Sequence, residues 1–264
     1  MTEQNILLAF ILTAIAGLST GIGSLIALLA KHTNTKFLCA SLGFSAGIML
    51  YVSFMEMIPQ GKEELISVFG DKMGTLYLIL AFFGGIAFIN LIDFLIPESL
   101  NPHEIQGVED MDKKSALKRT GLVVAMSIAI HNFPEGIATF TSALGSLDVA
   151  IPITIAIAIH NIPEGIAVAV PIYHATGSRK KAFWYSFASG LAEPFGALIA
   201  YLFLMQFWTP AMNGIVLAAV SGIMVFISLD ELLPSAEKYG EHHLSISGLV
   251  AGMLVMAFSL YLFV

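Results

Sequence analysis

Long apolar runs follow one another along almost the whole chain and are separated by short polar segments. Eight of them have the roughly 20 residues that a helix needs to cross about 30 Å of hydrocarbon. They cover residues 5–30, 37–58, 74–96, 121–144, 150–173, 182–207, 211–234 and 244–264. The longest polar segment, about 97–120, is too short for a soluble domain. The pattern therefore predicts one all-α membrane domain over residues 1–264, with eight transmembrane helices.

The composition supports a membrane protein. Of the 264 residues, 57% are hydrophobic and only 12% are charged, whereas about a quarter of the residues of soluble proteins are charged. Cys39 is the only cysteine, which excludes an intrachain disulfide and a metal site built from several thiolates.

The basic residues predict the orientation in the membrane. No Lys or Arg precedes the first apolar run, so we expect a retained span with the N-terminus outside. Cytoplasmic loops collect Lys and Arg. In this orientation the inner loops, including 97–120, hold ten basic residues, and the outer loops hold only Lys62 and Lys72. Eight spans then place both termini outside the cytoplasmic, or inner, membrane.

Two stretches near the start of the chain return near its end. Residues 17–27 resemble 190–200, and 47–59 resemble 222–234, with shifts of 173 and 175 residues. Small residues recur in membrane helices because they let backbones approach, but matching Ser, Glu and Pro positions favour a true repeat. Since five spans separate the equivalents, they cross in opposite directions. We expect a 3+2+3 arrangement, in which spans 1–3 and 6–8 are inverted repeats around central spans 4 and 5.

A polar motif occurs twice, near the centres of spans 4 and 5. "IHNFPEGIA" at 130–138 returns as "IHNIPEGIA" at 159–167, 29 residues later. A charge at the bilayer centre costs about 3 kcal/mol on insertion scales, so some interaction must offset it. Residues four apart share a helix face, which predicts His131 over Glu135 and His160 over Glu164.

The side chains of the motif suit a divalent metal ion. Imidazole, carboxylate and amide oxygen are ligands for zinc, iron(II), manganese or cobalt. A third carboxylate, Glu193, lies in the middle of span 6, where the matching position of span 1 is Thr20. The predicted metal ligands are His131, Asn132, Glu135, His160, Asn161, Glu164 and Glu193. They would hold one ion or two bridged ions; the alternative is buried His–Glu pairs without metal.

Four acidic residues outside the motifs are candidates for the entrance and exit of an ion path. Glu56 is expected near the outer end of span 2, and Asp93, Asp230 and Glu231 near inner ends of spans 3 and 7. Acidic side chains at a mouth concentrate cations, although helix-end residues also simply reach water. The same two interpretations apply to the loop residues His103, Glu104, His242 and His243.

The two HNxPEG motifs, the number of spans, the polar loop after span 3 and the Glu-Pro of span 6 resemble the ZIP family of divalent metal transporters. The bacterial ZupT-like branch is most similar, over essentially the whole chain. The resemblance implies a binuclear centre. One ion would lie near His131, Glu135, His160 and Glu164, and a second near Asn132, Asn161 and Glu193, with the first two glutamates bridging. Other branches of the family carry different residues at the position of His160. A histidine there suggests that the protein accepts several metals.

We therefore expect an importer that moves divalent metal, zinc foremost and also iron, manganese, cobalt or cadmium, from the outside or periplasm to the cytoplasm. It would have no prosthetic group, and its partners would be the transported ions and the lipid bilayer, with no nucleic acid and with a homodimer as a candidate assembly. A metal-selective channel with the same ligands is an alternative. An intramembrane metalloprotease or di-iron oxidase is less favoured, because the His-Glu-x-x-His and Glu-x-x-His orders are absent from the spans.

Overall fold

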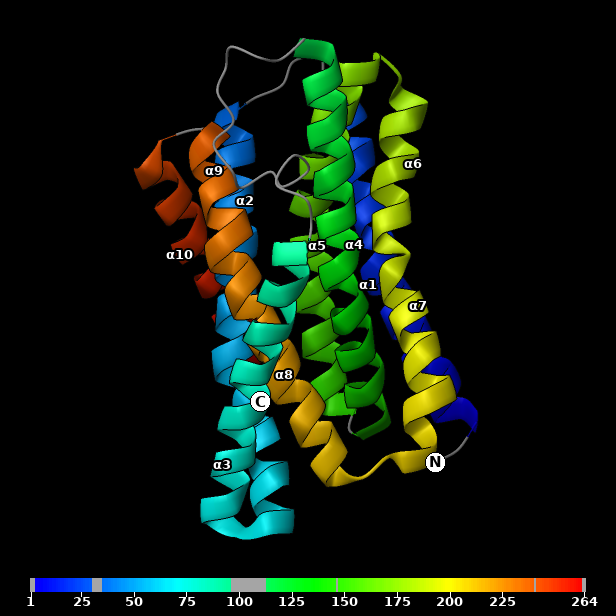
Figure 1. Cartoon of the computed structure of the whole chain (residues 1–264), viewed down its shortest axis with the longest axis vertical. Helices are drawn as coiled ribbons and strands as arrows, with labels where there is room; N and C mark the ends of the chain where they lie inside the picture. Colours follow the sequence, from blue (N-terminus) through cyan, green and yellow to red (C-terminus); the bar gives the residue numbers. More distant parts are fainter. Residues whose placement is uncertain (1–2, 30–34, 96–112, 146, 240, 263–264) are drawn as a thin grey trace.

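The computed structural model describes residues 3–29, 35–95, 113–145, 147–239 and 241–262, and all regular elements within these ranges are helical. The long helices run side by side in a single elongated bundle (Figure 1). Together with the apolar composition, this confirms an all-α membrane protein. His103 and Glu104, with most of the expected 97–120 loop, lie outside the described residues.

The helices follow the apolar runs closely. Their bounds are α1 Glu3–Leu29, α2 Thr35–Val52, η1 Ser53–Met57, α3 Ile58–Leu95, α4 Lys113–Gly145, α5 Leu147–Thr176, α6 Arg179–Gly190, α7 Ala192–Ile199, η3 Ala200–Leu204, η4 Met205–Phe207, α8 Pro210–Ile227, η5 Ser228–Leu232, α9 Leu233–Tyr239 and α10 His242–Tyr261.

Six segments of the described chain are long and apolar enough to cross a membrane. One of them, Thr35–Leu95, contains two of the expected spans. It reverses at Gly70, whose φ of 74° is readily adopted only by glycine, so the two runs form a helical hairpin. The run 121–144 lies in α4, which is not among the six segments. The count of eight spans therefore stays a prediction.

The helices pack as two bundles (Figure 1). Helices α2, α3, α8, α9 and α10 contact one another on one side, and α1, α4, α5, α6 and α7 on the other. The bundles meet chiefly where α2 packs on α5 and α4 on α8. The largest apolar core lies across this junction and includes Leu42, Met49, Ile157 and Met224.

Wide helical turns occur at matching positions of the sequence repeat. Ser53–Met57 and Ser228–Leu232 are π-helical, and they are related by the same 175-residue shift. In each, the residue after the turn donates its N–H five residues back, from Ile58 to Ser53 and from Leu233 to Ser228. The next residue is proline in both copies and has no N–H, which removes one ordinary helical hydrogen bond and favours the wider turn.

Two glycines of the polar motifs permit close helix contacts. A Cβ on Gly136 would overlap the carbonyl oxygen of Glu193, and a Cβ on Gly165 would overlap that of Thr20. Thr20 and Glu193 are equivalent in the 173-residue repeat, so the same contact is made twice. These glycines hold α4 against α7 and α5 against α1 at backbone contact.

We predict that Gly136→Ala lowers stability by about 1–3 kcal/mol, because the added methyl group must push α4 away from α7. The measurement is the thermal midpoint in detergent, followed by loss of the monodisperse peak on gel filtration. Gly84→Ala is the matched control, since a Cβ there meets no atom within 4 Å. Equal midpoints for the two variants would contradict the packing.

Candidate metal site

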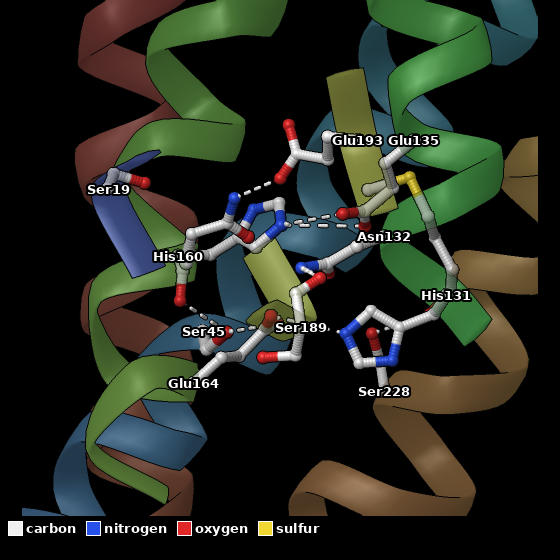
Figure 2. Close-up of polar contacts among 12 residues, drawn as sticks. Ser19, Ser45, His131, Asn132, Glu135, His160, Glu164, Ser189, Glu193 and Ser228 are labelled. Carbon is white, nitrogen blue, oxygen red and sulfur yellow. Dashed lines mark hydrogen bonds and ion pairs between the residues drawn. The ribbon is translucent and has the colours of Figure 1, made fainter. Parts of the chain in front are cut away.

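The two polar motifs face each other in the middle of the bundle. Adjacent helices α4 and α5 carry them, and α7 brings Glu193 to the same place (Figure 2). All seven predicted ligand residues are buried, with at most 1% of each exposed. The prediction that the clusters meet in the interior, rather than point toward lipid, is confirmed for these side chains.

Histidine and glutamate pair across the two helices. His131 Nε2 lies 3.1 Å from Glu164 Oε2, while His160 Nε2 lies 3.4 Å from Glu135 Oε1 (Figure 2). The sequence predicted that each histidine would stand over the glutamate of its own helix. That spacing does put both side chains on one face, but the face turns toward the partner helix, and the contacts form there.

The two asparagines are anchored by their amide nitrogens. Asn161 Nδ2 donates to Ala16 O at 3.0 Å and also to Glu193 Oε1. Asn132 Nδ2 donates to Ser189 O at 3.4 Å. Ala16 and Ser189 are equivalent in the 173-residue repeat, so α1 and α6 hold the two amides in the same way. This anchoring leaves the amide oxygens to point elsewhere.

Several buried ligand atoms have no hydrogen-bond partner among the described residues. They are Asn132 Oδ1, Asn161 Oδ1, Glu193 Oε2 and the Nδ1 atoms of His131 and His160. An unpartnered buried polar atom costs about 1–3 kcal/mol, so several such atoms in one cluster favour a bound water or ion. Oxygen and imidazole nitrogen together suit a divalent cation.

In the described part of the chain, no three or more His, Cys, Asp and Glu side chains are already arranged to hold one metal ion. The cross-helix pairs explain this, because each histidine is directed at a glutamate. An ion that entered would have to replace the His–Glu contacts with its own bonds. The same four groups would then change from mutual partners to ligands.

A serine from the other bundle also contacts the cluster, and the sequence analysis missed it. Ser45 of α2 is fully buried, and its Oγ lies 3.4 Å from Glu164 Oε1 and 3.3 Å from His160 O. Ser45 lies within an apolar run of the sequence. The only signal that could have identified it as part of the cluster is a polar residue at a position expected to be buried. It connects the polar cluster to the junction between bundles.

The expected entrance and exit residues lie on three different elements. Glu56 on η1 and Asp93 near the end of α3 are half-buried, as are Asp230 and Glu231 on η5. The charge of Glu231 is within electrostatic range of His131. His242 pairs with Glu237 at 2.5 Å, and both side chains are exposed.

Comparison with known proteins agrees with this geometry. A family model described as ZIP Zinc transporter matches residues 97–260. The chain is 58% identical to the protein named zinc transporter ZupT of Clostridium perfringens, over 99% of this chain and 98% of that protein. It is 60% identical to the zinc transporter ZupT of Streptococcus mutans, over 99% and 100% of the two chains. The chain belongs to the ZIP family. As a ZIP protein it is a multi-pass membrane transporter, so neither enzymatic alternative applies.

We predict that the cross-helix pairing in this ZIP protein appears as energetic coupling. In metal-free protein, the stability losses of His131→Ala and Glu164→Ala should be non-additive by about 0.5–3 kcal/mol, because either change alone removes the contact. The pair His131→Ala and Glu135→Ala, on one helix, is the control and should be closer to additive. Thermal midpoints of the single and double variants in chelator provide the measurement. Stronger coupling within the helix than across would contradict the pairing.

Proposed function

We propose that this ZIP protein imports zinc across the cytoplasmic membrane through the buried cluster formed by α4, α5 and α7. The observation that carries the proposal is the convergence of two His, two Asn and three Glu, all buried, with several ligand atoms unpartnered. Zinc is the ion in the names of the relatives, and these nitrogen and oxygen ligands suit it. Iron, manganese, cobalt and cadmium are further candidate cargoes, because such ligands accept other borderline ions.

The cluster offers ligands for two ions. The His–Glu groups of the cross-helix pairs would hold the first ion. Asn132 Oδ1, Asn161 Oδ1 and Glu193 Oε2 would hold the second, and their lack of partners supports this. Glu135 and Glu164 would bridge the two ions, since a carboxylate has an oxygen for each. A site of this kind, with no thiolate, replaces the ion's water and still allows release.

The proposed path runs from Glu56 to the cluster and then past Glu231, Asp230 and Asp93 to the cytoplasm. Its direction rests on the positive-inside bias, with both termini outside. The equivalent π turns and glycine contacts support an eight-helix 3+2+3 architecture with inverted repeats. In such folds the two halves exchange arrangements around a central site, so each side opens in turn. The homodimer stays a prediction that mass measurement in detergent would test.

We predict that Glu135→Ala and Glu164→Ala each abolish zinc accumulation while the protein still reaches the membrane. The reason is that each removal takes a carboxylate from both ions. Radioactive zinc uptake into proteoliposomes provides the measurement, with exposed Glu63→Ala as the control of equal charge change. Wild-type uptake by both site variants would defeat the assignment. Saturation of the wild-type rate with zinc would indicate a carrier, and a linear rate a channel.

Removing Glu193 should have a smaller effect, because only the second ion uses it. For Glu193→Ala we expect the bound zinc of the purified protein to fall from two ions to one, with uptake reduced but measurable. Metal content by elemental analysis after gel filtration is the measurement, and wild-type protein handled in parallel is the reference. A variant that still binds two zinc ions would argue against the placement of Glu193.

A further inference from the structure

A hollow of about 470 Å³ lies at the start of α6, away from the buried cluster. Its lining residues are Ser178, Lys180, Lys181, Trp184, Tyr185 and Ala188. Helix α6 is at the edge of the bundle, so this hollow is on the outside of the molecule (Figure 1). The volume falls in the range of about 300–1,000 Å³ that is usual for ligand pockets. Its walls combine cationic and aromatic side chains.

The cationic end of the hollow has no anionic partner among the residues that the structure describes. Arg179, Lys180 and Lys181 are consecutive and exposed, and in the described part of the chain none of them takes part in a salt bridge. The backbone N–H of Lys181 is capped by Ser178 Oγ at 3.3 Å, which fixes the first turn. Three adjacent cations without an ion pair in the described ranges produce a positive local potential that attracts an anion.

The rest of the hollow is apolar and follows one helix face. Lys181, Trp184, Tyr185 and Ala188 are spaced at i, i+3, i+4 and i+7, so they lie in one row down α6. Trp184 is 53% exposed and Tyr185 is 39% exposed, while the small Ala188 leaves room beneath them. Trp and Tyr gather where hydrocarbon meets headgroups. The row therefore runs from the membrane surface into the apolar layer.

The segment Arg179–Phe207 is long and apolar enough to span a membrane, and its three basic residues are at its first end. A ligand that fits both parts of the hollow must have an anionic group at the membrane surface and an apolar chain below it. A free anion would satisfy the lysines but leave the aromatic row unused. A neutral lipid would contact the aromatic row but leave the lysines without an anionic partner.

We propose that this hollow binds an anionic phospholipid. The phosphate contacts Lys180 and Lys181, and one acyl chain lies along Trp184, Tyr185 and Ala188. Each basic residue near an anionic surface contributes about 1 kcal/mol, or about fivefold in affinity, so the two lysines together give a preference of about 25-fold over a neutral lipid. The binding site is independent of the proposed function in transport.

Trp184 provides the probe. The chain has two tryptophans, so Trp208→Phe leaves Trp184 as the only one. The protein is reconstituted in phosphatidylcholine vesicles that contain phosphatidylglycerol brominated near the top of its chains, or equally brominated phosphatidylcholine. Brominated phosphatidylglycerol should quench Trp184 at a much lower mole fraction. Lys180→Gln with Lys181→Gln should reduce this preference about 25-fold, and Lys→Arg at both positions should retain it.

Lys62→Gln with Lys72→Gln is the matched control, since it removes two exposed lysines elsewhere and should leave the quenching unchanged. Equal quenching by both lipids, or a preference that survives Lys180→Gln with Lys181→Gln, would overturn the proposal. So would loss of the preference on adding inorganic phosphate at constant ionic strength, which would assign the hollow to a free anion. If Trp208→Phe does not fold, native mass spectrometry replaces the quenching assay. It counts the phosphatidylglycerol molecules that remain bound to the protein with both tryptophans, and to the two double lysine variants made in that protein.

Discussion

The burial of imidazole and carboxylate groups in the centre of a membrane-spanning bundle is the constraint on which this structure depends. Each charge costs about 3 kcal/mol there, and these side chains are buried away from bulk water. The pairs His131–Glu164 and His160–Glu135 reduce that cost by joining opposite charges or a donor and an acceptor. In the proposed transport, a divalent cation would replace these contacts with its own bonds to the same groups.

The same constraint accounts for the backbone around the cluster. Side chains can pair across α4 and α5 only if the surrounding helices come close enough to exclude lipid, and Gly136 and Gly165 allow this contact at α7 and α1. Helix α6 contributes from its buried face, where Ser186 Oγ donates to Gly165 O at 3.1 Å. The lysines and aromatic residues of the lipid-facing hollow lie on the opposite face of this helix. One helix thus carries residues of both the surface hollow and the interior contacts.

Much of this arrangement could be predicted from the sequence, and the failures have physical causes. The length of the apolar runs predicts membrane-spanning helices. The polar motif is unfavourable inside a membrane and occurs twice, which predicts that its two copies meet. Spacing along one helix says which residues share a face but not what that face touches, so the cross-helix pairing was missed. Ser45 was missed because a serine in an apolar run looks like helix packing. The hairpin at Gly70 depends on one residue with positive φ.

The repeat explains why the site is asymmetric although its scaffold is symmetric. Asn132 and Asn161 are anchored to equivalent carbonyls, and their helices contact equivalent backbone at Glu193 and Thr20. Only one of these two positions has a carboxylate. Two carboxylates would have placed four glutamates in one buried cluster, which adds a further charge to bury in the membrane interior. Threonine at position 20 keeps the packing without that charge, so in the proposed site the second ion would be held from the α7 side.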